Sequence, residues 1–134
     1  MTAPIPIGPT LNKIGQIFVN VKDLDRAIAF YRDILGMKFL FTAPPGMAFF
    51  DCGGVRIMLG VADRPELSHA ASVIYYKVDD IEKVYEVFHA RGVEFIIKPH
   101  LVAQMPAYDL WLADFKDSED NILALMSEVP KEVA

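Results

Sequence analysis

The chain carries the same pattern twice, and this repeat constrains the fold more than any other feature. The segments IGQIFVNVKDLDRAIAFYRDILGMKFL and ASVIYYKVDDIEKVYEVFHARGVEFII each open with an apolar run that alternates with period two, as β-strands do. Asp23 and Asp80 then stand where a helix N-cap is expected, and Gly36 and Gly92 end the two helical patterns. The repeat therefore predicts two copies of one structural module.

Each copy continues with further strands. The first runs into MAFFDCGGVRIMLG, two short strands around a Gly53-Gly54 turn, and the second into YDLWLADFKDSEDNILALM, two strands around a polar turn. Each half thus reads strand, helix, strand, strand, strand, which predicts an α+β fold. We expect one domain over residues 1–134, with module one at about 14–60, a linker at about 61–71 and module two at about 72–127, because either half alone is too small to fold well.

Composition excludes several classes of function. A formal net charge of -5 argues against a nucleic-acid partner, which requires a basic surface. No run approaches the roughly 20 apolar residues of a membrane span, and the N-terminal segment lacks the pattern of a secretory signal. Cys52 is the single cysteine, so no internal disulfide can form. These features predict a cytoplasmic protein with no membrane partner.

Strand alternation divides the strand residues between two faces. One face mixes apolar and polar side chains, as small-molecule pockets do: Gln16, Phe18, Asn20, Arg56, Met58, Val73, Tyr75, Lys77, Ile122, Ala124 and Met126. The other face is almost wholly apolar and is predicted to lie beneath the helices: Ile17, Val19, Val21, Ile57, Leu59, Ile74, Tyr76, Val78, Leu123 and Leu125.

The repeated strand, the segment KDLDRAIAFYRDILGM and the closing DSEDNILAL resemble the vicinal oxygen chelate (VOC) superfamily, over roughly residues 14 to 127. That superfamily includes glyoxalase I, bleomycin-resistance proteins and extradiol dioxygenases. The resemblance implies two βαβββ modules that form a cupped mixed sheet around a hollow. Similarity to the bleomycin-resistance branch further implies a homodimer with the ligand near the subunit or module interface.

The resemblance also marks four positions where metal-using members hold a divalent ion. They fall on Gln16, Met58, Val73 and Ala124, where histidine or glutamine, glutamate, histidine and glutamate are expected. Gln16 can ligate a hard cation, a thioether is a poor ligand for one, and valine and alanine have no donor. We therefore expect no metal cofactor at these positions, and a divalent ion only with displaced ligands.

Several further residues have two interpretations each. His100, in the loop-like stretch KPHLVAQMPAYDLW, is a functional candidate or a surface histidine, and the sequence leaves open whether it points into the cup. Tyr108 and Trp111 form an aromatic ligand wall or a dimer interface. Arg56 receives an anionic ligand or is a solvated charge. His69, in the linker, is a weaker candidate ligand.

Two polar features complete the set of candidates. Gln16 on an inward face requires a hydrogen-bond partner, from a ligand or from a neighbouring strand. The acidic cluster DSED is explained by a hairpin tip, and no nucleophile elbow or phosphate loop occurs.

The favoured hypothesis is a metal-independent protein that binds a small organic molecule in the cup. The residues predicted to contact that ligand are Gln16, Arg56, Tyr75, His100, Tyr108 and Trp111, with Met58 and Ala124 as apolar wall. The alternative is an enzyme, a glyoxalase-like lyase or isomerase or a dioxygenase, that uses displaced ligands such as Gln16 and His100. The identity of the ligand, any reaction and the dimer geometry stay open at this point.

Overall fold

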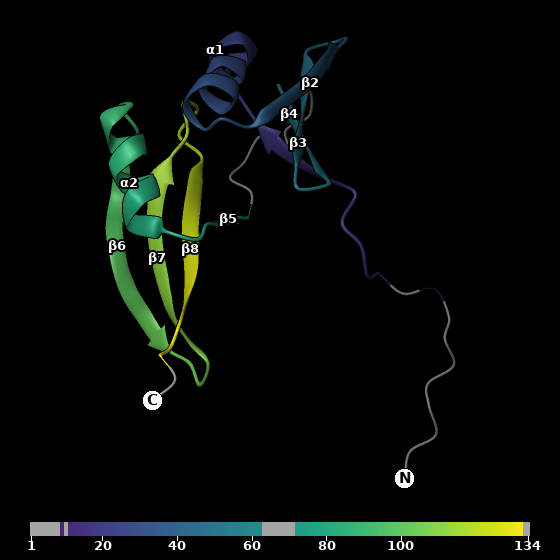
Figure 1. The fold of residues 1–134 in the computed structure, drawn as a ribbon. Helices are drawn as coiled ribbons and strands as arrows, with labels where there is room; N and C mark the ends of the chain where they lie inside the picture. Colours follow the sequence, from purple (N-terminus) through teal and green to yellow (C-terminus); the bar gives the residue numbers. More distant parts are fainter. Residues whose placement is uncertain (1–8, 10, 63–71, 133–134) are drawn as a thin grey trace.

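The computed structural model describes residues 9, 11–62 and 72–132, and the two modules follow each other along the chain (Figure 1). The first contains β1 (Gln16–Asn20), α1 (Leu24–Ala29), η1 (Phe30–Ile34), β2 (Lys38–Ala43), β3 (Met47–Cys52) and β4 (Val55–Gly60). The second contains β5 (Ile74–Lys77), α2 (Ile81–Ala90), β6 (Phe95–Gln104), β7 (Tyr108–Lys116) and β8 (Ile122–Pro130).

Each module folds into one four-stranded mixed sheet. The strand orders are β1-β4-β3-β2 and β5-β8-β7-β6, so the two sheets have the same topology. In each sheet the first and last strands of the module pair in parallel, and the remaining pairs are antiparallel. The predicted α+β fold of two βαβββ modules is confirmed.

The helix ends form where the sequence places them. Asp23 and Asp80 each accept a hydrogen bond at 3.1 Å from a backbone amide of the first helical turn, which satisfies a donor that has no partner inside the helix. Gly36 and Gly92 have φ angles of 73° and 90°, a left-handed conformation that favours glycine.

The first helix departs from a regular α-helix in its last turn. From Phe30 it continues as the π-helical segment η1, in which the amide of Leu35 donates to the carbonyl oxygen of Phe30 at 3.0 Å. Phe30 and the adjacent Tyr31 are both buried in this wider turn. Helical spacing alone predicts an ordinary α-helix here, since it does not distinguish the two.

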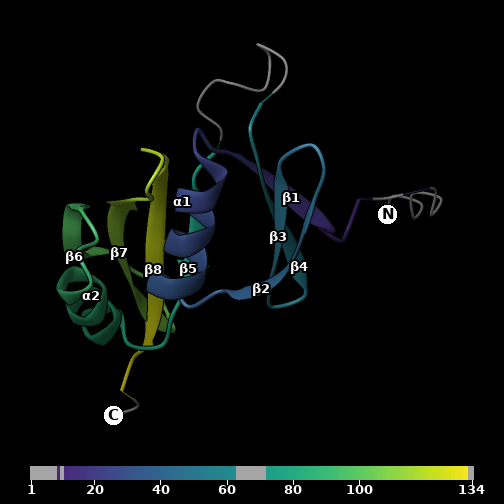
Figure 2. The ribbon, with the colours of Figure 1, turned by 90° about the horizontal axis from the view of Figure 1, so that it is seen from above.

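One hydrophobic core joins the two modules. The ten residues predicted to lie beneath the helices all belong to this core or pack against it. Helix α1 packs on β3 and β4, and α2 packs on β6, β7 and β8. In Figure 2, α1 lies between the first sheet and the strands β5 and β8. The helices therefore cover one face of each sheet, and that face of both modules contributes to the same core.

The segment around His100 is a strand rather than the loop-like stretch predicted from its prolines. Residues Phe95–Gln104 form β6, which pairs with β7 through register shifts on either side of His100. Pro99 is tolerated because β6 is an edge strand, where a missing N–H breaks no ladder on its outer side. The prolines thus mark an irregular edge of the sheet.

No helix within the described residues is long and apolar enough to cross a membrane.

Candidate functional site

The face of each sheet opposite the helices carries partly exposed apolar side chains. Exposed fractions are 52% for Tyr75, 45% for Ile122, 40% for Val73 and 46% for Phe41. Side chains of this size remain in contact with water at a free-energy cost of roughly 25 cal/mol for each Å² of apolar surface. These two uncovered faces are therefore the candidate contact surfaces of the protein.

A cavity of about 540 Å³ lies where β1 approaches the beginnings of β5 and β8. This volume is in the range of small-molecule pockets, about 300–1,000 Å³. Its lining comes from both modules: Ile17, Phe18, Val19, Asn20, Ser72, Val73, Ile74, Asp120, Asn121, Ile122 and Leu123. We call it the junction cavity.

Four of these lining residues, Phe18, Asn20, Val73 and Ile122, were predicted for the mixed face, and four more, Ile17, Val19, Ile74 and Leu123, for the opposite one. The sequence does not indicate the polar contribution of the β7–β8 turn. The side-chain amide of Asn121 donates to the backbone oxygen of Asn20 at 2.9 Å, and the Asn20 side-chain oxygen accepts from the Ala62 amide at 3.1 Å. These bonds fix the polar end of the cavity across the two modules.

The Phe18 ring can occupy its position because residue 60, on the neighbouring strand β4, is a glycine. A Cβ atom at Gly60 would lie 2.9 Å from Cε1 of the Phe18 ring, closer than real Cβ contacts allow. Any larger residue at position 60 therefore displaces the ring that forms one wall of the junction cavity.

The predicted ligand residues of the first module lie together on the uncovered face, beside the cavity rather than in its lining. In the β1–β4 pair, Gln16 lies opposite Arg56, and Phe18 lies opposite Met58. The Gln16 amide contacts the Met58 sulfur at 3.6 Å, so its polar partner in the chain comes from a neighbouring strand. The Arg56 guanidinium lies 5.7 Å from the centroid of the Phe49 ring, a cation–π distance.

The predicted residues of the second module are divided between the two faces. Tyr75 pairs with Ala124, which is fully buried. His100 lies opposite Leu112 in the β6–β7 pair, and Leu112 lies opposite Met126 in the β7–β8 pair. Residues that lie opposite each other in a sheet share a face, and Met126 is on the face of Ala124 and Tyr75, so His100 lies on that face too. Its Nδ1 atom is 2.9 Å from the carbonyl oxygen of Lys98.

The two aromatic residues of β7 that were predicted to contact the ligand, Tyr108 and Trp111, point to opposite faces of the sheet. Tyr108 shares the uncovered face with Leu112 by alternation, toward the end of β8. Trp111 points to the other face, where it packs against the core and lines a cavity with Ser127 and Ile81. Trp111 therefore does not lie on the face that carries the other predicted ligand residues.

The residues at the four metal positions do not provide a donor set for a divalent ion. Gln16 and Met58 contact each other on the first sheet, while Val73, just before β5, and Ala124, on β8, belong to the second module and carry no donor. Of the displaced pair, Gln16 lies on β1 of the first sheet and His100 on β6, an edge strand of the second. The described residues contain no group of three histidine, cysteine or acidic side chains close enough to hold a metal. His69 lies outside the described residues.

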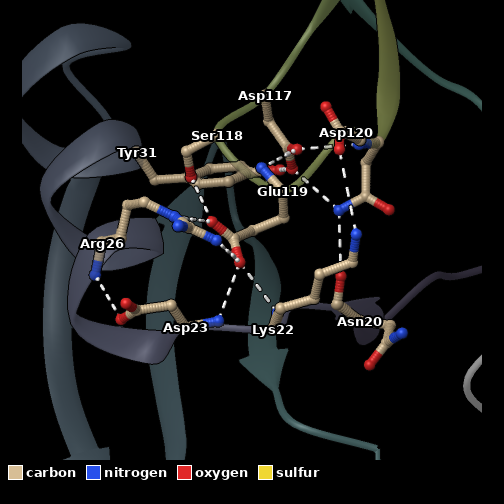
Figure 3. Close-up of polar contacts among 10 residues, drawn as sticks. Asn20, Lys22, Asp23, Arg26, Tyr31, Asp117, Ser118, Glu119 and Asp120 are labelled. Carbon is tan, nitrogen blue, oxygen red and sulfur yellow. Dashed lines mark hydrogen bonds and ion pairs between the residues drawn. The ribbon is translucent and has the colours of Figure 1, made fainter.

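A buried carboxylate, which the sequence did not single out, joins the modules beside the junction cavity (Figure 3). Glu119, from the β7–β8 turn, has a fully buried side chain. It accepts hydrogen bonds at 2.8 Å from the amides of Lys22 and Asp23, and at 2.7 and 3.0 Å from the Arg26 guanidinium. It thus holds the N-terminus of α1, where the helix dipole favours negative charge.

A second buried carboxylate organises the same turn. Asp117 accepts hydrogen bonds from the Tyr31 hydroxyl at 2.7 Å, from the Glu119 amide at 2.8 Å, and from the backbone and side-chain nitrogens of Asn121 at 2.9 Å. The prediction that a hairpin tip explains DSED is therefore incomplete. Asp117 and Glu119 point inward and bind the first module, and an acidic run contains no signal of that direction.

Burial and hydrogen bonding shift the ionisation of this cluster. Burial alone would raise the pKa of Glu119, but hydrogen bonds from Arg26, from the Asp23 and Lys22 amides and from Ser118 outweigh it and lower the pKa to about 2. Burial, with the nearby Asp117 carboxylate, raises the pKa of Tyr31 well above its ordinary value. Glu119 is therefore anionic, and Tyr31 a neutral donor, across the physiological range of pH.

Comparison with known proteins identifies the family. The profile of the Glyoxalase/Bleomycin resistance protein/Dioxygenase superfamily matches residues 13–125. The chain belongs to this superfamily, as its repeated strand and helix pattern predicts.

Its relatives carry different descriptions. YraH of Bacillus subtilis (strain 168) is 27% identical over 84% of this chain and 96% of its own length. The metallothiol transferase FosB of Lysinibacillus sphaericus (strain C3-41) is 28% identical over 58% of this chain and 57% of its own length, so the chain spans little more than half of that relative. A solved superfamily member from Sphaerobacter thermophilus DSM 20745 has a TM-score of 0.72 and 22% identity, over 88% of this chain and 98% of its own. That structural likeness shows the fold alone.

Proposed function

We propose that this protein binds a small organic molecule in the junction cavity and on the uncovered faces beside it, without a metal at the four family positions. The observation that carries the proposal is the cavity itself, which has ligand-sized volume and is lined by residues of both modules. Phe18, Val73 and Ile122 supply apolar walls, and Asn20 and Asn121 supply polar groups at one end. This is the composition of a pocket that binds a largely apolar molecule with a polar group.

The predicted residues around the cavity extend this site. Tyr75 follows Val73 on the same face, and Gln16 precedes Phe18. Beyond them, Arg56 stands over Phe49, whose ring stacks with Phe41 at 4.7 Å between centroids. A planar anionic molecule suits this surface, because its ring stacks on the aromatic pair and its charge meets Arg56.

We expect the planar anion 1-anilinonaphthalene-8-sulfonate to bind the native protein, with increased dye fluorescence, and the variant Val73→Trp to weaken that binding. The indole fills part of the junction cavity, and a loss of about 1–3 kcal/mol of binding free energy corresponds to binding about 5- to 150-fold weaker. Fluorescence titration measures the change.

The matched control is Val102→Trp, since Val102 is a similarly exposed valine on β6, outside the cavity lining. Its dye binding should equal that of the unsubstituted protein. Equal weakening in both variants, or in neither, would contradict the assignment of the dye to the junction cavity.

A titration with divalent metal ions tests whether the protein is independent of metal. In the proposal no group of donors replaces Val73 and Ala124, so the metal-stripped protein should bind Mn²⁺, Ni²⁺ and Zn²⁺ no more tightly than about micromolar, or about 8 kcal/mol. Calorimetric titration measures this affinity. Binding of one ion per chain that is lost in His100→Ala would instead support the enzyme with displaced ligands.

We also propose that two copies associate in the cytoplasm. Tyr75, Ile122 and Phe41 expose apolar area on the uncovered faces, and a second copy laid over these faces would remove it from water and enlarge the ligand site. The half-buried Cys52 has no disulfide partner, which suits a reducing compartment. The molar mass in solution tests the association.

A further inference from the structure

A further cavity lies on the helix-covered side of the sheets, where the η1–β2 connection of the first module meets β5 of the second. Its volume is about 320 Å³, at the lower end of the range for small-molecule pockets. It shares no lining residue with the junction cavity. Its apolar lining consists of Leu35, Met37, Val78, Phe88, Phe115 and Leu125. We call it the seam cavity.

A hydrogen-bond donor without a partner lies at the wall of the seam cavity. Tyr76 lines it, and the Tyr76 hydroxyl oxygen is buried without a hydrogen-bond partner among the described residues. A buried hydroxyl without a partner costs about 1–3 kcal/mol, and such groups are rare in native proteins. The buried Tyr31 of the same region, by contrast, donates its hydroxyl hydrogen bond to Asp117. A molecule from outside the chain could therefore supply the hydrogen-bond acceptor that this hydroxyl lacks.

The hydroxyl of Tyr76 and the thiol of Cys52, which both line the seam cavity, are neutral at neutral pH. Burial, with Cys52 and Asp117 nearby, raises the pKa of the Tyr76 hydroxyl, and burial, with Asp51, raises that of the Cys52 thiol. Each positive side chain of the cavity lining has a negative side chain nearby. Lys38 stands opposite Asp51 across the β2–β3 pair, and Lys77 forms an ion pair with Glu128 at 2.9 Å.

We propose that the seam cavity is a second ligand site, which takes a neutral, apolar small molecule with one hydrogen-bond acceptor, such as an aryl ketone. The ketone oxygen accepts the hydrogen bond that the Tyr76 hydroxyl has free, while the ring packs against Phe88, Phe115 and Leu125. This site is independent of the proposed ligand of the junction cavity, because the two cavities share no lining residue.

The test compares acetophenone with ethylbenzene, which has a similar shape and no acceptor. Cys52 lines the seam cavity and is the only cysteine of the chain, so its alkylation by iodoacetamide, followed by mass spectrometry, reports occupancy. Acetophenone should slow alkylation at a concentration about tenfold lower than ethylbenzene, the factor expected for one added hydrogen bond to a buried donor. In Tyr76→Phe the two compounds should protect equally.

The variant is expected to fold, because removing an orphaned hydroxyl leaves the packing of the ring unchanged, and its thermal unfolding checks this. Val73→Trp should keep the full acetophenone effect, which separates this site from the junction cavity. Equal protection by both compounds in the unsubstituted protein would overturn the proposal. So would an acetophenone advantage that persists in Tyr76→Phe, or no protection up to the solubility limit.

Discussion

Replacing Glu119 with glutamine should destabilise the protein at pH 7 by about 2–3 kcal/mol, and this difference should disappear in acid. The folded pKa of Glu119 is about 2, below its ordinary value of 4.5. A lowered pKa means that the ionised form stabilises the folded state. That stabilisation is complete above about pH 4.5 and is lost as the pH falls through 2. Urea unfolding of both proteins at intervals from pH 7 to pH 2 measures the difference.

The control for this experiment lies in the same turn. Asp120 is also acidic, but it is exposed and forms only a 3.8 Å ion pair with the exposed Lys22. Asp120→Asn should therefore change stability by less than about 0.5 kcal/mol at any of these pH values. If Glu119→Gln behaves like Asp120→Asn, the buried carboxylate does not hold α1 in solution.

Replacing Asp117 with alanine should have the larger effect, a loss of about 3–5 kcal/mol. The substitution leaves the buried Tyr31 hydroxyl and the amides of Glu119 and Asn121 without their acceptor. A domain of this size is stable by only about 5–15 kcal/mol, so we expect a midpoint of thermal unfolding about 10–15 °C lower. Differential scanning calorimetry measures the shift.

Two further variants provide comparisons for the effect of Asp117→Ala. Tyr31→Phe removes one of the Asp117 bonds and should cost about 1–2 kcal/mol. Asp33→Ala removes an exposed carboxylate paired only with Arg32 at 2.8 Å and should cost less than about 0.5 kcal/mol. A similar cost for Asp117→Ala and Asp33→Ala would show that the buried network adds nothing to stability.

Much of the fold could be predicted because its determinants are local or periodic. Asp23 and Asp80 cap helices through amides three residues away, and Gly36 and Gly92 end them through their own backbone angles. Alternation assigned Val19 and Leu59 to the core, since a strand has only two faces. Such features need no knowledge of the partner that packs on them.

The candidate site was predicted less well, because it depends on which strands meet. Alternation put Phe18 and Val73 on the mixed face, but it ranked them no higher than Met58 or Ala124. The contact between the end of β1 and the start of β8 selects the residues that line the junction cavity. Trp111 was assigned to the ligand because it is aromatic, whereas its register opposite Ser127 turns it toward the core.

The sequence by itself determined the repeat, the βαβββ order, the caps and the two faces of each strand, because each follows from residues close together in the chain. Only the tertiary structure decided that Glu119 and Asp117 point inward, that Tyr76 lacks a hydrogen-bond partner, and that two cavities form where the modules meet. The physical reason is that burial and hydrogen-bond partners are properties of contacts between the two modules, across as many as 101 positions in the case of Asn20 and Asn121.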